Sequence, residues 1–152
     1  MKNFKLLKEM NQKFNLDIKD IEIKELNISN RNLGNEILDY VKRIEFKELK
    51  ELNLFNNKIS DIKVLEKVKF EKLEILDLSW NQISDINILE KVNFKELKEL
   101  YLIGNKISDI KVLEKVKFEK LEILNLSNNK ISQSENELII SKLRSTINNI
   151  WV

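Results

Sequence analysis

Residues 49–62 read LKELNLFNNKISDI, and this stretch decides the fold because it recurs along the chain. Its apolar residues and its asparagine return three more times at steps of 24 residues, with the last copy ending at Ile131. In the first copy the recurring positions are Leu49, Leu52, Leu54, Asn57, Ile59 and Ile62. A fixed period of this length predicts a repeat architecture, in which each unit stacks on its neighbours to bury a shared core.

The four copies follow the pattern L-x-x-L-x-L-x-x-N-x-I, and on this pattern the chain resembles the leucine-rich repeat family. Weaker copies of the pattern flank these four, at Ile23, Leu26 and Ile28 and at Ile147, Ile150 and Val152. The likeness is to the short-repeat class of intracellular phosphatase regulators and bacterial internalins. It implies an α/β solenoid, a curved right-handed superhelix with a parallel β-sheet on the concave face and short helices on the convex face.

The repeats predict one domain over residues 1–152. Residues 1–22 would form an N-terminal cap, residues 23–132 five repeats of 24–26 residues, and residues 133–152 a C-terminal helix and a final strand. A longer period lies over the short one, since residues 57–79 and 105–127 differ only at Asp77 versus Asn125. The duplicated unit is therefore two repeats.

Both ends of a solenoid need covers, because a terminal repeat otherwise exposes its apolar flank. A capping helix over residues 2–14 is predicted by four apolar residues at helical spacing, Phe4, Leu7, Met10 and Phe14. Near the other end, Ser134 and Glu137 have the spacing of a capping box. The apolar side of the helix that follows, over about 135–146, is expected to be Leu138, Leu143 and Ile147.

The buried positions of the repeat have structural roles. Leucines two residues apart, such as Leu52 and Leu54, point to one face of a strand, which is the interior of the coil. An asparagine follows each of four strands by three residues, at Asn57, Asn81, Asn105 and Asn129. Its amide can satisfy backbone groups at a tight bend, and the resemblance implies an asparagine ladder. A spine of core phenylalanines is expected at Phe46, Phe70, Phe94 and Phe118.

The convex half of each repeat is expected to contain a short helix. Ile62, Leu65 and Val68 are spaced three residues apart, which suits one or two helical turns. A serine–aspartate pair precedes each such segment, for example Ser60 and Asp61, and offers N-cap side chains.

Composition argues against several classes of function. The 27 basic and 25 acidic residues nearly balance, whereas nucleic-acid binders usually carry a basic excess. Without cysteine or histidine the chain has no disulfide, no thiol nucleophile, and neither the commonest general base nor the commonest metal ligand. With two glycines there is no phosphate-binding loop. We therefore expect no enzyme activity, no cofactor and no metal.

The chain also shows no apolar run long enough for a signal peptide or a membrane span, so we expect a cytoplasmic protein without membrane contact. A pair of concave carboxylates could imitate a glycosidase, but a shallow open sheet offers no cleft that excludes water.

Side chains that alternate with the buried leucines face the concave surface, and their identity is not needed for folding. Apolar side chains gather on the middle three repeats, at Phe55, Trp80, Tyr101 and Ile103, with carboxylates at Glu51, Asp77 and Glu99 along the border and Asn53 among them. Clustered exposed aromatics with a polar rim mark interaction sites. In the alternative, Phe55 and Trp80 merely stabilise the strand-to-turn junction, and the carboxylates serve solubility.

The sequence therefore predicts a scaffold or adaptor that binds another protein on its concave face. A structural role is the alternative, either as a module of a larger chain or through weak self-association of the apolar patch. No nucleic acid is expected as a partner.

Overall fold

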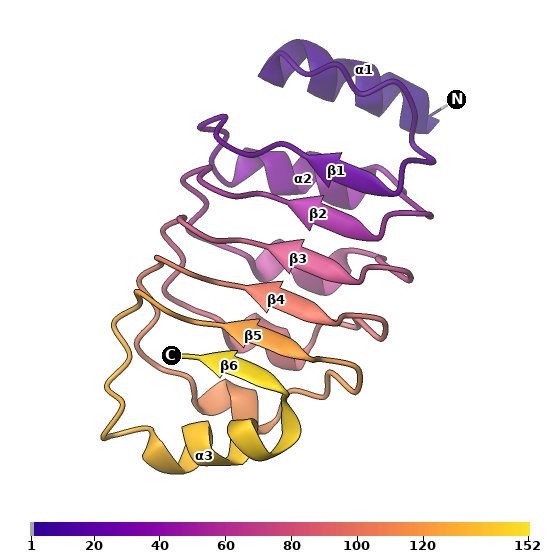
Figure 1. Ribbon diagram of the computed structural model, residues 1–152. Coiled ribbons are helices and arrows are strands. Elements are labelled where there is room, and N and C mark those ends of the chain that lie inside the picture. The colour runs from indigo at the N-terminus through magenta and orange to yellow at the C-terminus, as the bar shows by residue number, and fades with distance from the viewer. Residues whose placement is uncertain (1) are drawn as a thin grey trace.

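A single parallel sheet runs the length of the molecule. In the computed structural model, which describes residues 2–152, six three-residue strands stack in the order β1-β2-β3-β4-β5-β6 (Figure 1). The strands are β1 (Glu25–Asn27), β2 (Glu51–Asn53), β3 (Ile75–Asp77), β4 (Glu99–Tyr101), β5 (Ile123–Asn125) and β6 (Asn149–Trp151). Their central residues align as Leu26, Leu52, Leu76, Leu100, Leu124 and Ile150. The predicted repeat solenoid is confirmed.

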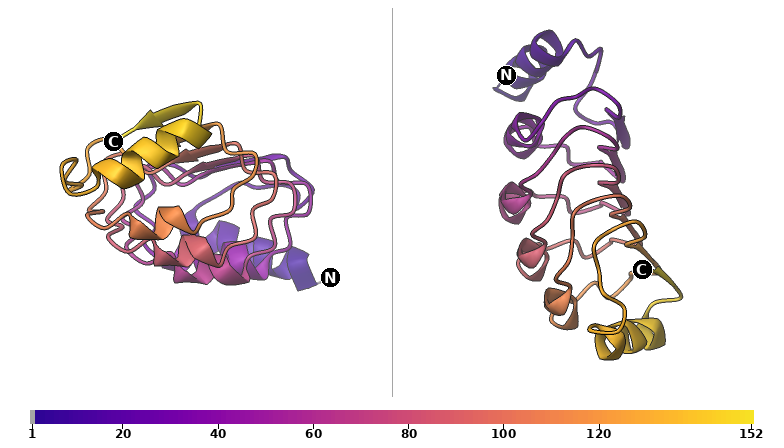
Figure 2. Two further views of the ribbon diagram at one scale, coloured as in Figure 1. Left: turned by 90° about the horizontal axis from the view of Figure 1, so that it is seen from below. Right: turned by 90° about the vertical axis from the view of Figure 1, so that its left-hand side faces the viewer.

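Helices occupy the opposite side of the coil. They are α1 (Lys2–Phe14), α2 (Glu36–Arg43), the 3₁₀ helices η1 (Lys63–Lys67), η2 (Asn87–Glu90) and η3 (Lys111–Glu114), and α3 (Glu137–Thr146). The right-hand view of Figure 2 shows the strands stacked closely on one side while the helices fan out on the other. The sheet is therefore on the concave face and the helices are on the convex face, with α1 at one end and α3 at the other.

The alternating leucines fill the interior as their spacing predicts. Leu52, Leu76 and Leu100 are at most 1% exposed, and three spine phenylalanines, Phe46, Phe70 and Phe94, are buried beneath the convex helices. The rings of Phe70 and Phe94 lie 6.0 Å apart between centroids. Phe118 is only half-buried, because it stands where the regular repeats give way to α3.

Each of the three 3₁₀ helices begins two residues after an aspartate. Asp61 Oδ1 accepts a hydrogen bond from the backbone N–H of Lys63, the first residue of η1, at 2.9 Å. Asp85 and Asp109 make the same bond to the first residues of η2 and η3. In each predicted serine–aspartate pair, the aspartate and not the serine therefore accepts the hydrogen bond from the first residue of the helix.

A recurring asparagine closes the coil after each of the strands β2 to β5. Asn81 Oδ1 accepts from the N–H groups of Asn57 (3.0 Å) and Ile59 (2.9 Å), and its Nδ2 donates to the carbonyls of Leu54 and Leu78 (3.0 Å each). Asn57, Asn105 and Asn129 bond to neighbouring repeats in the same manner. The side chain thus replaces the partners that a tight turn leaves unmet.

The first repeat departs from this geometry, since Arg31 stands at the asparagine position. Its guanidinium Nη1 donates to the carbonyl of Asn15 at 3.1 Å, which ties the turn to the end of the capping helix α1. Arg31 therefore links the repeats to the cap, where no earlier repeat exists to receive an asparagine amide.

Alternating charges explain the doubled period of the sequence. Just before the strands, one column of positions reads Glu48, Lys72, Glu96, Lys120 and another reads Lys50, Glu74, Lys98, Glu122. Ion pairs join neighbours within the columns at 2.6–2.7 Å, and Glu74 is held by both Lys50 and Lys98. Hydrogen bonds from these two lysines lower the pKa of Glu74 to about 2. Each repeat therefore carries the opposite charges to its neighbours, and two repeats make one electrostatic unit.

The two terminal helices correct the sequence-based predictions in detail. α1 spans the predicted residues, but Phe4 is 56% exposed and Leu6 is buried in its place. α3 begins at Glu137 after Asn136, and the predicted capping-box bond between Ser134 and Glu137 does not form. Leu138 was expected in the core and is 86% exposed. Leu143 and Ile147 are buried as predicted, but Ile139 and Ile140 take the place of Leu138 on the buried side, so α3 is rotated about its axis relative to the expected orientation.

Candidate protein-binding face

The outward side chains of the sheet form four rows along the concave face, one residue per repeat in each row. The first row is Glu25, Glu51, Ile75, Glu99, Ile123 and Asn149. The second row is Asn27, Asn53, Asp77, Tyr101, Asn125 and Trp151. The third row is Ser29, Phe55, Ser79, Ile103 and Ser127, and the fourth is Asn30, Asn56, Trp80, Gly104 and Asn128. Backbone bonds such as Asn56 N–H to Ser79 O and Trp80 N–H to Ile103 O continue the ladder through the last two rows.

The second row has a local structural role at most of its positions. Asn53 Oδ1 accepts from the N–H of Phe55 at 2.9 Å, and Asp77 Oδ1 accepts from the N–H of Ser79 at 2.8 Å. Asn27 and Asn125 make the equivalent bond. These short side chains thus fix the bend that follows each strand.

Tyr101 breaks this rule in the fourth strand. A phenol cannot reach back to the amide two residues on, and its hydroxyl instead donates to Glu99 Oε2 at 2.7 Å. Burial first, and then the hydrogen bond to Glu99, raise the pKa of Tyr101 to about 12, with a further contribution from the charge of Asp77. The fourth repeat therefore lacks the hydrogen bond to the turn that Asn27, Asn53, Asp77 and Asn125 make, and it presents an aromatic ring on the concave face instead.

The fourth row imposes a backbone conformation that suits few residues. Its members have positive φ angles of 57° (Asn30), 52° (Asn56), 55° (Trp80), 64° (Gly104) and 59° (Asn128). Glycine adopts this left-handed region without strain and asparagine tolerates it, whereas a bulky residue rarely does. Trp80 is therefore the second departure from the structural preferences of the repeat, one strand away from Tyr101.

The indole of Trp80 lies directly over Gly104 of the next repeat. A Cβ atom placed on Gly104 would come within 2.9 Å of the indole Cδ2 and 3.0 Å of Cε3. The absence of a side chain at Gly104 therefore makes room for the ring, while the other face of Trp80 stays open, with 52% of the residue exposed. Trp80 and Gly104 form a matched pair across two repeats.

The remaining predicted residues lie around this pair. Phe55 and Ile103 are half-buried in the third row, and the small Ser79 lies between them, so these two apolar side chains are not neighbours within that row. Ser79 is 2% exposed, and its hydroxyl has no hydrogen-bond partner within residues 2–152. Glu51 is exposed, whereas Asp77 and Glu99 are half-buried beside Tyr101.

Trp151 is a member of the face that sequence reasoning missed. It aligns with Asn125 in the second row and is 46% exposed. Strand alternation through Ile150 could have revealed it, since the residue after a buried strand position points outward. The face thus ends in a second exposed tryptophan, two strands beyond Tyr101.

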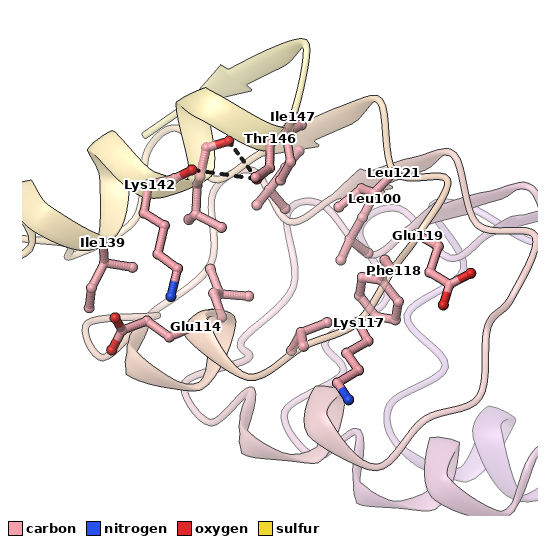
Figure 3. A pocket seen from close by; sticks show the side chains of 14 residues that line it. Leu100, Glu114, Lys117, Phe118, Glu119, Leu121, Ile139, Lys142, Thr146 and Ile147 are labelled. Carbon is pink, nitrogen blue, oxygen red and sulfur yellow. Dashed lines mark hydrogen bonds between the residues drawn. The ribbon is translucent and has the colours of Figure 1, made fainter.

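A separate apolar pocket opens on the other side of the coil, between the last repeat and α3. It has a volume of about 390 Å³ and is lined by Phe118, Leu121, Ile139, Leu143 and Ile147 among others (Figure 3). Charged side chains, including Lys117 and Lys142, stand at its margin.

Within residues 2–152, no three acidic side chains gather as metal ligands would. Nor does any of these residues belong to a helix long and apolar enough to cross a membrane.

Fold and face together define a repeat solenoid with an open, partly aromatic sheet surface. The family model described as Leucine Rich repeats (2 copies) matches residues 47–91 and again residues 95–139. These matches cover more than half of the chain, and the protein belongs to the leucine-rich repeat family. Domains of this family typically serve as protein-interaction modules.

Solved structures of similar fold include two internalins of Listeria monocytogenes. The internalin inlF matches with 26% identity and a TM-score of 0.65, over 87% of this chain and 35% of that chain. The present chain thus spans about a third of the length of inlF. Internalin C2 matches with 18% identity and a TM-score of 0.42, over 96% of this chain and 91% of that chain. A search of curated proteins found no significant match.

Proposed function

We propose that this protein is a non-catalytic scaffold that binds another protein on its concave face, with Trp80 and Tyr101 as the central contacts. One observation carries the proposal: both residues stand where the repeat otherwise places a residue that helps it fold. Strained or locally unfavourable residues that persist in a structure point to a role in function. Trp and Tyr are also the residues most enriched among binding hot spots.

The other candidate residues take supporting roles. Phe55 and Ile103 extend the apolar area, and Glu51, Asp77 and Glu99 border it. Asn53 contacts the partner only with the part of its amide that the bond to Phe55 leaves available. Asn57, Asn81, Asn105 and Asn129 serve the fold, because their amides are engaged with the backbone.

Back-substitution to the residues that neighbouring repeats use offers a clean test. The double variant Trp80→Asn/Tyr101→Asn should fold, because Asn128 and Asn125 already occupy the equivalent positions of the fifth repeat. We expect the double variant to lose binding of any partner that the wild-type protein captures from a lysate of the cells that produce it. A matched control is Asn128→Gly, which alters the same row and keeps the permitted backbone conformation.

Quantitative mass spectrometry of the captured proteins would compare the three forms. A partner held by wild type and by the Asn128→Gly control, but lost from the double variant, supports the proposal. Equal recovery with wild type and the double variant contradicts it.

Self-association through the same face is the second candidate function. It is favoured by two tryptophans that are about half exposed, Trp80 and Trp151, on one sheet surface. Sedimentation equilibrium at several protein concentrations tests it. A monomer at all concentrations contradicts self-association, whereas dimers that disappear in the Trp80→Asn variant support it.

A further inference from the structure

The concave face differs in charge from the rest of the molecule. Its four rows hold 22 residues, and four of these are acidic: Glu25, Glu51, Asp77 and Glu99. None of the 22 is lysine or arginine, although the chain contains 27 basic residues, slightly more than its acidic ones. A nearly neutral protein thus presents a sheet surface on which every charged residue is acidic.

The acidic side chains of the face are also unpaired, unlike those beside it. Glu48, Glu74 and Glu96, which lie just outside the rows, each form an ion pair with a lysine of a neighbouring repeat. No carboxylate of the four rows forms an ion pair within residues 2–152. Three of the four glutamates in the flanking columns are therefore paired within the molecule, whereas the four carboxylates of the face have no ion-pair partner there and are available to an outside group.

Carboxylates and aromatic rings meet in the middle of the face. Asp77 and Tyr101 are register partners on β3 and β4, and Glu99 accepts the Tyr101 hydroxyl. Asp77 and Glu99 each use one carboxylate oxygen in these local bonds, Asp77 to the N–H of Ser79, and keep the other available. Trp80 directly follows this strand with one ring face open.

This combination suits a cationic side chain on an apolar stem. The ring faces of tryptophan and tyrosine attract lysine and arginine, and a nearby carboxylate adds direct charge pairing. The alkyl stem of either side chain packs on aromatic surface while the charged head reaches the acidic rim. An anionic or purely apolar segment would leave Asp77 and Glu99 without compensation.

We infer that the partner presents a basic segment to this face, with lysine or arginine side chains next to apolar ones, and that Asp77 and Glu99 receive the cationic groups beside Trp80 and Tyr101. The inference rests on the proposed function, since it names the chemistry of the partner at the same face. Complementary charge of this kind steers association and selects among partners.

Selection from a random peptide display library, with wild type as the bait, tests the inference directly. The selected peptides should be enriched in lysine or arginine adjacent to leucine, isoleucine or an aromatic residue. Their affinity should fall as salt rises, because exposed charge pairs are screened. Enrichment of acidic or uncharged peptides overturns the inference.

Variants that remove charge without changing shape provide the second arm. Asp77→Asn reproduces Asn125 of the fifth repeat, and Glu99→Gln keeps an acceptor for the Tyr101 hydroxyl, so both should fold. The double variant should bind the selected peptides about tenfold more weakly than wild type, as expected when cation–π contacts lose their neighbouring charges. The control Glu48→Gln, which removes one charge outside the rows, should bind them normally. Equal affinity for all three proteins overturns the inference.

Quenching of Trp80 fluorescence reports the charge of the face without any peptide. In a Trp151→Phe background, caesium ions should quench Trp80 more effectively in the wild-type face than in the Asp77→Asn/Glu99→Gln face. Iodide ions should show the opposite change, since the carboxylates of Asp77 and Glu99 repel them from the wild-type face only. Quenching by either ion that is the same in both proteins contradicts the charge assignment.

The outcomes separate this inference from the proposed function. Uncharged peptides that bind wild type but not Trp80→Asn/Tyr101→Asn would leave the binding face intact and overturn only the cationic partner. A library without any peptide that depends on Trp80 and Tyr101 would overturn both. Concentration-dependent dimers that the Asp77→Asn/Glu99→Gln variant abolishes would identify the basic occupant as a second copy of this chain, against a separate partner.

Discussion

The third and fifth repeats of this protein are almost the same sequence, and they differ where the concave face begins. Residues 57–79 and 105–127 are identical except for Asp77 and Asn125, and the next residues are Trp80 and Asn128. Both pairs occupy the same backbone, with φ angles of 55° at Trp80 and 59° at Asn128. The interior, the asparagine ladder and the flanking charges are thus duplicated unchanged, while two of the four concave positions, Asp77 and Trp80, differ from their counterparts. The comparison teaches that the positions which build the coil are kept between these repeats, while positions on the concave face can change without altering the backbone.

The largest effect on stability is expected at the asparagine ladder. The third and fifth repeats both have asparagine there, but Asn81 is buried and Asn129 is not. Asn81→Ala should cost about 3 kcal/mol of unfolding free energy, because it leaves buried N–H and carbonyl groups without partners. Asn129→Ala should cost less, since Asn129 is half-exposed to water that can replace the lost bonds. Urea denaturation of both variants measures the difference, and equal losses would contradict the role of burial.

The next effect concerns Gly104, which lies beneath the indole of Trp80. Asn128, the residue equivalent to Trp80 in the fifth repeat, has no such glycine beneath it. Gly104→Ala should destabilise by about 1–2 kcal/mol, because alanine is strained at a φ of 64° and its Cβ would displace the indole of Trp80. In a Trp80→Asn background the second contribution disappears. A double-mutant cycle by denaturation should therefore show coupling of at least about 0.5 kcal/mol between the two positions. Additive losses would mean that the indole does not rest on Gly104 in solution.

Converting the third repeat into the fifth should raise stability slightly. Trp80→Asn relieves a bulky residue from the left-handed region and should add about 1 kcal/mol to the unfolding free energy. The reverse change, Asn128→Trp, serves as the control and should remove a similar amount. A marked loss of stability in Trp80→Asn would show that the indole is a structural cover, which is the alternative that the sequence left open.

The smallest effect is the titration of Tyr101. In a Tyr40→Phe background, ultraviolet absorbance should show Tyr101 ionising near its pKa of about 12, and Glu99→Gln should lower this pKa by removing the carboxylate neighbour. The pKa is raised in the folded state, so the associated stability is complete below the ordinary tyrosine pKa of 10.0. It should decline as the pH rises from there to about 12. An ordinary pKa in the folded protein would contradict the half-buried geometry.

Much of the architecture could be predicted from the sequence, and the errors lie where periodicity ends. The leucines, the spine phenylalanines from Phe46 to Phe94 and the capping helix were expected where they stand. The rotation of α3 was not, and Leu138 was placed in the core although it is exposed. A repeat pattern is reinforced by several copies, whereas a terminal helix appears once and its face is set by the surface that it covers.

The concave face was only partly predictable. Its residues follow from strand alternation, and Trp80 and Tyr101 were recognised as candidates from their aromatic character alone. Tyr101 donates a hydrogen bond to Glu99, and the indole of Trp80 packs over Gly104. Both contacts depend on side-chain conformations, which the spacing of residues in the sequence does not specify. The bonds of Asn53 and Asp77 to their own turns also required the structure.

The sequence by itself determined the stacking of coils, because leucines two residues apart and one asparagine, repeated every 24 residues, can all be buried when successive repeats stack on one another. Only the tertiary structure decided which outward residues depart from the needs of the repeat. That decision depends on backbone angles and on contacts between side chains 24 residues apart, such as Trp80 and Gly104, which exist only after the coils have stacked.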